Sequence, residues 1–363
     1  MKILAVIDSL GFGGAETQLA DVLRLMTERL GHECLLCSVL PRQNLEVLIS
    51  GHIERVYLNK TSRLSLPRVT RELARVVRRY QPDVVYSRLP LANGLSRIAT
   101  KFPGCQVRHV AGVDTAPELY TWSHARQHPG NVVFRWLEKR ADRVICNSDG
   151  TARGVIAVGY PSARISVVPN GIDLNRFRPP SQRTSHHPTR LVCTASLRPE
   201  KGVERLVRML APLLAQGQVT LAVVGDGAER DRLEQVISNL SLGPTVELLG
   251  ARQDVVSILQ NSDLYVSAAY VEGFGIAVAE AGATGIPVVC MAAPGGLDEV
   301  IVDGVTGYLI PRDREDLFRE RVHQLGSDSA LRERLGAAAR AHVATRYDIE
   351  DIVRRVEHCL VAT

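Results

Sequence analysis

The chain has 363 residues, of which 45% are apolar and 23% are charged. This length is more than one hydrophobic core usually serves, and the apolar content is enough to fill two, so the composition predicts a globular protein of two domains. Charge is unevenly distributed, because the first 180 residues hold 25 basic against 15 acidic side chains, whereas the remaining 183 hold 19 against 24. A basic N-terminal half suits an anionic membrane surface or an acidic acceptor, and solvated surface arginines are the alternative explanation.

Neither a secretory leader nor a membrane span is predicted. Residues 1–7 are too short for the apolar core of a signal peptide and are followed by Asp8. The longest nearly apolar stretch, residues 273–296, contains Glu280 together with glycines and a proline, which is typical of a helix, a turn and a strand. Seven cysteines lie scattered in apolar segments, as expected for buried thiols in a reducing compartment. We therefore expect a cytoplasmic protein.

The N-terminal half is expected to be a parallel α/β domain. Residues 2–7 predict a strand, Gly11, Gly13 and Gly14 predict a turn, and apolar residues at helical spacing after them predict a helix. Further strands, separated by segments long enough for crossover helices, are predicted at residues 34–39, 83–86, 107–110, 143–146 and 165–168. The turn lacks a full G-x-G-x-x-G pattern, since Thr17 stands where a further small residue is needed, so a dinucleotide site is not favoured.

Cys34 and Cys37 have the C-x-x-C spacing of redox and metal sites. Residues 32–39 are predicted to form a strand, in which positions three apart point to opposite faces. No second cysteine pair completes a zinc site. We therefore expect these two thiols to be structural.

A basic amphipathic helix is predicted around residues 63–79. Leucines and valines form its apolar side, and the segment carries Arg63, Arg68, Arg71, Arg75, Arg78 and Arg79. Such a helix is suited to contact with anionic lipid, which would make the protein peripheral on the inner face of the plasma membrane. A solvated basic face is the default alternative.

Residues 179–188 are polar and rich in proline, as are segments that join domains. After them the pattern restarts, with strands predicted at residues 191–195, 219–224, 246–249, 264–266 and 287–290. The second half is therefore expected to be another doubly wound domain. The predicted organisation is a first domain of residues 1–178, a second of residues 179–345, and a last helix within residues 346–363.

Two carboxylates, Glu272 and Glu280, flank the start of a predicted helix. Gly273 and Gly275 allow the backbone to approach a ligand closely, and the apolar run after them should begin a helix whose free N–H groups suit a phosphate. Carboxylates accept hydrogen bonds from sugar hydroxyls while the helix end binds the anion. The segment therefore suits a nucleotide sugar.

Arg198 and Lys201 directly follow the first predicted strand of the second domain, and Gly202 opens the next helix. Both cations are expected at the carboxyl edge of the sheet, where they would bind a diphosphate and neutralise charge on a leaving nucleoside diphosphate. The alternative is a pair of exposed residues at a helix start, which is electrostatically unfavourable unless an anion is present.

With these motifs the chain resembles the retaining glycosyltransferases of family 4, which have the GT-B fold and whose hallmark is two glutamates separated by seven residues. The resemblance includes Gly13-Gly14-Ala15-Glu16, Asn170-Gly171-Ile172-Asp173 with Arg176-Phe177, Arg198-Pro199-Glu200-Lys201-Gly202, Gly225-Asp226-Gly227, Glu272-Gly273-Phe274-Gly275 and Gly304-Val305-Thr306-Gly307. Their joint order and spacing argue against coincidence.

The resemblance implies an α/β protein of two Rossmann-like, doubly wound parallel-sheet domains that face each other across a cleft. The last helix, residues 349–360, would cross back to the first domain. Within the hallmark motif, Glu280 is expected near the ribose hydroxyls and Glu272 near the donor sugar.

Further binding groups follow from the same resemblance. The backbone N–H groups of Phe274, Gly275 and Ile276 are expected to bind the sugar and the distal phosphate, while the Phe274 ring fills core. Gly13 and Gly14 match the loop that approaches the donor phosphate and the acceptor, although a glycine pair at a strand-to-helix turn also has a plain packing explanation.

Many relatives in the family carry a histidine near the reacting face of the donor sugar, after the strand that corresponds to residues 107–110. His109 is the imperfect match, because relatives have His-Gly or a similar pair there and His109 is followed by Val110. Arg108 or Asp114 is the alternative occupant of this place, and a buried core histidine explains His109 equally well.

The predicted activity is the transfer of a sugar from a nucleoside diphosphate sugar to a hydroxyl of a glycan or lipid-linked acceptor. The family resemblance implies that transfer proceeds with retention and serves bacterial surface polysaccharide or lipid-linked glycan synthesis. The expected catalytic set is Glu272, Arg198, Lys201 and His109. No D-x-D metal motif is present, so we expect no metal, no cofactor and no nucleic-acid partner. The alternatives are a nucleotide-sugar epimerase of the same fold and a non-catalytic nucleotide-sugar-binding subunit.

Overall fold

The computed structural model describes residues 1–11, 13–42, 52–115 and 129–362, and the chain forms two compact units. The first unit comprises Met1–Gly171 and Ile349–Thr363, and the second comprises Ile172–Asp348. Asn170-Gly171-Ile172-Asp173 spans the first boundary, and the predicted linker, residues 179–188, lies within the second unit.

The first unit is built on a parallel sheet of seven strands in the order β3-β2-β1-β4-β5-β6-β7. The strands are β1 (Lys2–Ile7), β2 (Glu33–Ser38), β3 (Glu54–Tyr57), β4 (Val84–Arg88), β5 (Arg108–Val113), β6 (Arg143–Cys146) and β7 (Ile165–Val167). The sequence analysis missed the edge strand β3, which is short and partly exposed. The strand order reverses between β1 and β4, and the carboxyl ends of strands at such a reversal are where doubly wound folds bind ligands.

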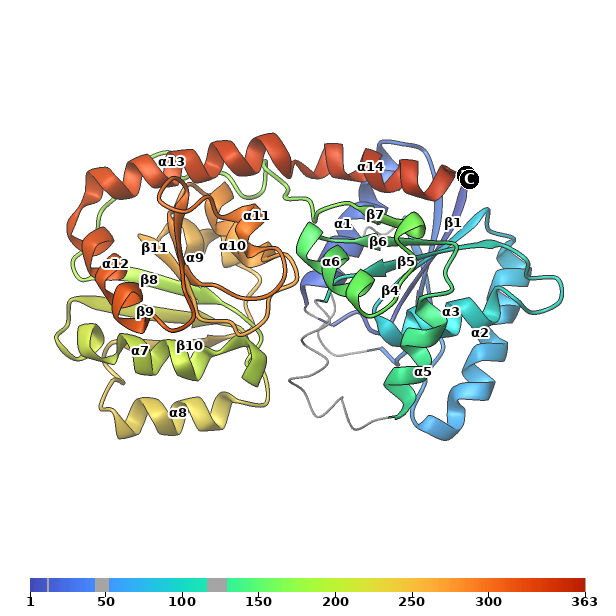
Figure 1. Ribbon diagram of the computed structural model, residues 1–363, viewed down its shortest axis with the longest axis horizontal. Helices are drawn as coiled ribbons and strands as arrows, with labels where there is room; N and C mark the ends of the chain where they lie inside the picture. Colours follow the sequence, from blue (N-terminus) through green and yellow to red (C-terminus); the bar gives the residue numbers. More distant parts are fainter. Residues whose placement is uncertain (12, 43–51, 116–128, 363) are drawn as a thin grey trace. The chain divides into compact units, whose positions relative to one another are not determined.

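Helices cover both faces of this sheet (Figure 1). They are α1 (Gly14–Glu28), α2 (Leu66–Tyr80), α3 (Pro90–Ala99), α5 (Pro129–Glu138), α6 (Asp149–Ala157) and α14 (Ile349–Val361). The helices α1 and α14 share one core with the sheet, whereas α2, α3 and α5 pack against the other face. Cys34 contributes to the first core and Cys37 to the second, so the predicted opposite orientation of these thiols is confirmed. All seven cysteines are buried, free thiols.

The second unit is built on a parallel sheet of six strands in the order β10-β9-β8-β11-β12-β13. The strands are β8 (Thr189–Thr194), β9 (Val219–Val224), β10 (Val246–Gly250), β11 (Leu264–Ser267), β12 (Val288–Met291) and β13 (Gly307–Ile310). The edge strand β13 was also missed. Two doubly wound parallel sheets confirm the predicted fold class, and here the order reverses between β8 and β11.

Two layers of helices complete the second unit. They are α7 (Val203–Ala215), α8 (Arg230–Asn239), α9 (Val255–Gln260), α10 (Ile276–Ala283), α11 (Leu297–Val300), α12 (Glu315–Ser327) and α13 (Ser329–Arg346). One core joins α7, α8 and α12 to the sheet, and another joins α9, α10 and the C-terminal part of α13. Within the described ranges, no helix is both long and apolar enough to span a bilayer.

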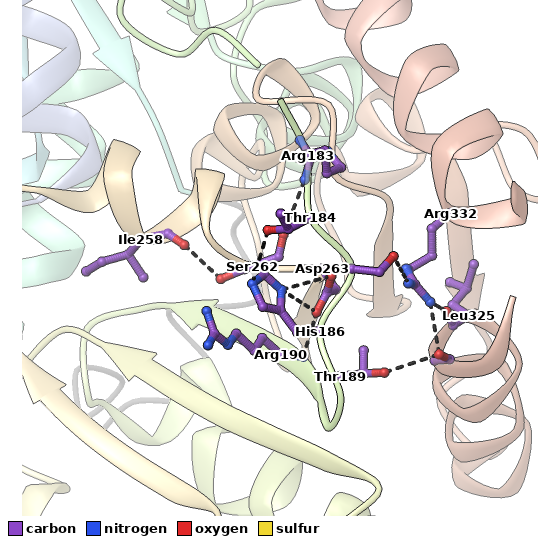
Figure 2. Close-up of polar contacts among 12 residues, drawn as sticks. Arg183, Thr184, His186, Thr189, Arg190, Ile258, Ser262, Asp263, Leu325 and Arg332 are labelled. Carbon is purple, nitrogen blue, oxygen red and sulfur yellow. Dashed lines mark hydrogen bonds and ion pairs between the residues drawn. The ribbon is translucent and has the colours of Figure 1, made fainter. Parts of the chain in front are cut away.

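The proline-rich segment 179–188 is bound to the second unit by side chains (Figure 2). The Arg183 guanidinium donates to the carbonyl oxygens of Ser262 and Thr284 at 3.3 and 2.7 Å. His186 Nδ1 lies 3.2 Å from Oδ2 of the buried Asp263, which also accepts the N–H of Arg190 at the start of β8. These contacts make the segment part of the second unit and not a free tether.

Candidate functional site

The loops that follow β8 and β11 meet at the reversal of strand order in the second unit. Lys201 ends a 3-10 turn after β8, and its Nζ lies 2.6 Å from Oε2 of Glu272, which follows β11. The backbones join as well, because the N–H of Tyr270 donates to the carbonyl oxygen of Glu200 at 2.9 Å. Two residues predicted for the site, 71 positions apart in the chain, are thus brought together at the expected edge.

Close backbone approach makes this pairing possible. Gly202 has a φ of +62°, and a Cβ there would lie 2.2 Å from the carbonyl oxygen of Ala268. Gly295, in the loop after β12, has a φ of +125°, and a Cβ there would lie 1.7 Å from the carbonyl oxygen of Glu272. Only glycine tolerates these approaches. The loops after β8, β11 and β12 therefore form one packed layer around the ion pair.

Arg198 differs from Lys201 in its surroundings. The Arg198 side chain is 68% exposed, and its nearest carboxylate oxygen, Glu200 Oε1, lies 4.0 Å away, at the limit of an ion pair. The Lys201 side chain is 25% exposed and is paired with Glu272. An exposed guanidinium at the start of this turn is available to an anion, and Lys201 adds a second positive charge one turn away.

The segment from Glu272 to Glu280 starts a helix as predicted. Gly275 is the N-cap and α10 runs from Ile276 to Ala283, which places half-buried Glu280 one turn inside the helix. Phe274 is 1% exposed and packs edge-to-face on Tyr347 with ring centroids 5.1 Å apart, so its ring fills core. Binding of a sugar and a phosphate by the backbone N–H groups of Phe274, Gly275 and Ile276 stays a prediction.

In the first unit, Gly13 and Gly14 begin α1 after β1. Gly13 is the N-cap in an extended conformation, and Gly14 is the first helical residue. The Glu16 carboxylate folds back over Gly13, because a Cβ on Gly13 would lie 2.3 Å from Glu16 Oε2. Burial raises the pKa of Glu16. A carboxylate in the first turn of a helix is stabilised by the helix macrodipole, and its contact with Gly13 is consistent with the packing explanation of the glycine pair. The approach of Gly13 and Gly14 to a donor phosphate stays a prediction.

The predicted end of the strand that contains His109 was wrong. Strand β5 continues to Val113, so His109 is its second residue and lies near the opposite edge from the loops. It is fully buried, its Nε2 lies 2.7 Å from the Ser87 hydroxyl, and burial lowers its pKa to about 3, so the ring is neutral. His109 has the surroundings of a core histidine, and Asp114, one of the two alternatives, is the residue that directly follows β5.

Sequence reasoning missed a buried ion pair at this edge. Arg88, the last residue of β4, binds the Asp114 carboxylate with two nitrogens, one of them Nε at 2.9 Å, and donates to Asn170 Oδ1 at 3.2 Å. A cavity of about 10 Å³, the size of one water molecule, is lined by these three residues, Gln18 and Asn147. Within the described ranges, Asn147 Oδ1 is buried without a hydrogen-bond donor. The sequence signal that could have indicated this ion pair is an arginine at the end of an apolar strand.

Asp8, the residue after β1, was not predicted as a site residue, and only the structure shows its surroundings. Its Oδ1 accepts the N–H of Ala92 in the first turn of α3 at 2.7 Å. Burial of the carboxylate, with smaller contributions from Glu16 and Glu138, raises its pKa from 3.8 to about 7, although backbone N–H donors oppose the shift. The carboxyl edge of the first sheet therefore carries several carboxylates and one arginine that is already paired.

Comparisons with known proteins agree with this architecture. Residues 12–176 match the Glycosyltransferase Family 4 model, and residues 177–342 match the Glycosyl transferases group 1 model. A GDP-mannose-dependent alpha-mannosyltransferase of Mycobacterium tuberculosis is 31% identical over 301 residues, which cover 79% of this chain and 75% of that protein. A D-inositol 3-phosphate glycosyltransferase of Mycobacterium marinum is 33% identical over 228 residues, 56% of this chain, and the match spans about half, 47%, of that relative's length.

Solved structures of the same architecture include HepE of Anabaena, crystallised with UDP and glucose. It superimposes with a TM-score of 0.84 at 24% identity over 100% of both chains. A sucrose-phosphate synthase of Thermosynechococcus elongatus gives 0.82 at 20% identity over 99% of this chain and 98% of its own. The fold is thus that of the GT-B class. The chain belongs to glycosyltransferase family 4, the glycosyl transferases group 1.

The pKa of Asp8 predicts a pH dependence of stability. The folded state keeps this proton up to about pH 7 and the unfolded state loses it near 3.8, so the folded state binds more protons in between and stability falls as pH rises through this window. Because Asp8 is partly exposed, we expect a reduced effect of about 1 kcal/mol between pH 5 and 7. Urea denaturation of wild type and Asp8→Asn measures it, and equal pH slopes for the two proteins would contradict it.

Proposed function

We propose that this protein is a retaining, metal-independent glycosyltransferase that moves a sugar from a nucleoside diphosphate sugar to a hydroxyl of a glycan or lipid-linked acceptor. A role in bacterial surface polysaccharide or lipid-linked glycan synthesis follows from the resemblance of the motifs. The donor class is supported by a relative named for GDP-mannose and by a structural neighbour that holds UDP.

One observation carries the proposal, namely the Lys201–Glu272 ion pair at the reversal of strand order, with exposed Arg198 in the same turn. A cation whose charge is balanced by a carboxylate is held ready for a diphosphate without an unpaired buried charge. When the donor binds, phosphate oxygens replace the carboxylate as partner of Lys201, and Glu272 is released to accept hydrogen bonds from sugar hydroxyls.

The remaining contacts with the donor are made by the helix that starts at Ile276 and by the loop before it. Its first N–H groups and those of Phe274 and Gly275 bind the distal phosphate and the sugar, because a helix N-terminus favours anions. Glu280, half-buried one turn inside the helix, accepts hydrogen bonds from the ribose hydroxyls. The acceptor is assigned to the loops of the first unit.

The transfer step breaks the bond between the anomeric carbon and the phosphate oxygen and forms a bond to the acceptor oxygen on the same face. The departing phosphate oxygen takes the acceptor proton. Arg198, Lys201 and the backbone N–H groups stabilise the charge that develops on the leaving diphosphate. No protein nucleophile is required, and the role of an electrophilic cation is filled by these side chains.

Two alternatives are separated by incubation of the protein with donor alone and with acceptor. An epimerase produces an epimeric donor without acceptor, and a binding subunit produces neither an epimer nor a transfer product although it binds the donor. A transferase forms product only when acceptor is added.

Removal of the charges tests the donor site. Lys201→Met should lower kcat/KM about 100-fold or more, because a donor to the transition-state charge is lost. Glu272→Gln should also lower turnover while leaving nucleoside diphosphate binding within a few fold. The control is Arg208→Gln, which breaks only an exposed i, i+4 pair with Glu204. Calorimetric titration with UDP and GDP and a transfer assay provide the measurements, and wild-type turnover of Lys201→Met would refute the assigned role.

The stereochemistry of transfer and its dependence on metal can be measured in the same transfer assay. The anomeric proton coupling in the NMR spectrum should show the donor's configuration, and EDTA should leave the initial rate unchanged since Arg198 and Lys201 supply the positive charge. An inverted product, or a rate that returns only with added Mg²⁺, would rule out the respective part of the proposal.

A membrane surface is the proposed second partner of the first unit. The helix α2 exposes an arginine stripe, defined as Arg68, Arg71, Arg75 and Arg79, whose spacing of three and four places them on one side. The opposite side packs into the core through valines and leucines of α2. One member, Arg68, pairs with Glu72 at 3.8 Å. Such a stripe matches the anionic headgroups of a cytoplasmic leaflet.

Replacement of Arg71, Arg75 and Arg79 by Gln should weaken binding to anionic vesicles about 100-fold, since each basic residue near such a surface contributes about 1 kcal/mol. Cosedimentation at low salt provides the measurement. A matched control replaces three exposed arginines of the second unit, Arg178, Arg334 and Arg346, by Gln. Equal loss in both variants would show only an effect of net charge.

A further inference from the structure

Exposed apolar side chains are concentrated in one part of the first unit. Among the described residues, eight large apolar side chains are exposed, and four of them lie on α5 and at the end of α6. They are Val133, Trp136, Ile156 and Val158. Scattered exposed apolar residues need no explanation, but a concentration with a polar rim marks a binding surface.

The helix α5 presents two of these residues on one outward side. Val133 and Trp136 are three positions apart, which places them together, and they are 54% and 53% exposed. We call these two residues the α5 apolar face. The inward side is fixed by Phe134, whose ring occupies the space left by Gly94 of α3, where a Cβ would lie 2.3 Å from it. The apolar face is therefore held outward by packing on the opposite side of the helix.

Cations border the α5 apolar face. The Arg140 guanidinium carbon lies 3.3 Å from the Trp136 ring centroid, and Arg140 Nη1 donates to the Trp136 carbonyl oxygen at 2.8 Å. Lys139 donates to the carbonyl oxygen of Val158, which brings the end of α5 against the second pair of exposed apolar residues. An amphipathic ring stacked with arginine and flanked by lysine is the combination found where proteins enter the headgroup layer of a bilayer.

The α5 apolar face and the arginine stripe lie on the same side of the first sheet. The helix α3 packs against both α2 and α5 (Figure 1). Leu64, 93% exposed, stands in the 3-10 turn just before α2 and adds an apolar side chain at one end of the stripe. Positive charge and exposed apolar groups thus occur together on this side. Binding to an anionic bilayer uses both kinds of group, whereas binding to an acidic protein surface needs only the charge.

We propose that the α5 apolar face inserts into the headgroup layer of an anionic lipid bilayer, with Trp136 as the anchoring residue. This inference rests on the proposed membrane contact of the arginine stripe and deepens it. Arginines alone hold a protein above the headgroups through charge, whereas insertion buries apolar area and persists when salt screens the charges.

The fluorescence of Trp136 tests whether this side chain enters the bilayer. The chain has two tryptophans, and Trp122→Phe leaves Trp136 as the single one, Trp122 being outside the described residues. With vesicles of phosphatidylglycerol and phosphatidylcholine, the emission of Trp136 should shift to shorter wavelength and be quenched by lipids brominated near the headgroup. Phosphatidylcholine vesicles alone should produce neither change.

A double variant tests how much the α5 apolar face contributes to the free energy of membrane binding. Trp136→Gln with Val133→Ser should weaken partitioning into the anionic vesicles about tenfold, as expected for the loss of two partly buried apolar side chains. The matched control, Val302→Ser with Val305→Ser, removes exposed apolar residues of the second unit, Val305 being 52% exposed, and should change partitioning less than twofold. Circular dichroism checks that both variants are folded.

The outcomes separate this proposal from the one on which it rests. Vesicle binding without a change in Trp136 emission, or equal partitioning of the double variant and its control, would overturn insertion and leave the arginine stripe as the contact. No vesicle binding at low salt would overturn both. A concentration-dependent dimer in the absence of lipid that disappears in the double variant would assign the face to a second copy of the chain and overturn insertion.

Discussion

The close approach of the loops after β8 and β11 is the constraint on which the candidate site of the second unit depends. Neighbouring helices leave the sheet in opposite directions where the strand order reverses, so a gap opens at the carboxyl edge. Here Gly202 lets the loop after β8 contact the loop after β11 across that gap, and Gly295 lets the loop after β12 pack against Glu272 beside it. The Lys201–Glu272 ion pair closes the layer. A cation and a carboxylate are thereby positioned by backbone packing, at a place that the fold itself keeps open for a ligand.

The two sheet edges differ in their electrostatics. In the second unit, the 68% exposed Arg198 lies 4.0 Å from Glu200 and Lys201 is paired with Glu272, so two cations stand at an edge where an anion can compete with carboxylates for them. In the described part of the first unit, the corresponding edge carries Asp8 and Glu16, both with raised pKa values, and its guanidinium is already bound to Asp114. Under the proposed function, the charge of a diphosphate is met by the second unit, and hydroxyl groups, which donate to carboxylates, suit the first.

Local patterns in the sequence predicted the architecture because each unit alternates buried apolar strands with amphipathic helices. Two edge strands, β3 and β13, were missed. Each is four residues long, two of the four residues of β3 are charged, and β13 begins at Gly307, which was assigned to a glycine-containing motif. The hallmark segment and the turn with Lys201 were predicted, because glycine and charge at a strand end carry local information. His109 was placed at the end of a strand that was predicted to stop at Val110, whereas β5 continues to Val113. The Arg88–Asp114 pair depends on contacts between strands, which one sequence does not encode locally.

The attachment of segment 179–188 to the second unit has a consequence for protein engineering. A proline-rich stretch is the intuitive place to cut when domains are exchanged among relatives, but a junction at residue 179 would replace residues 172–178, which belong to the second unit. The N–H of Ile172 donates to the carbonyl oxygen of Tyr347 at 2.7 Å, and Arg340 donates to the carbonyl oxygens of Leu174 and Phe177 at 3.2 and 2.8 Å. A chimera should therefore be spliced between Gly171 and Ile172, with the return junction between Asp348 and Ile349, so that each half keeps its own hydrogen-bond partners.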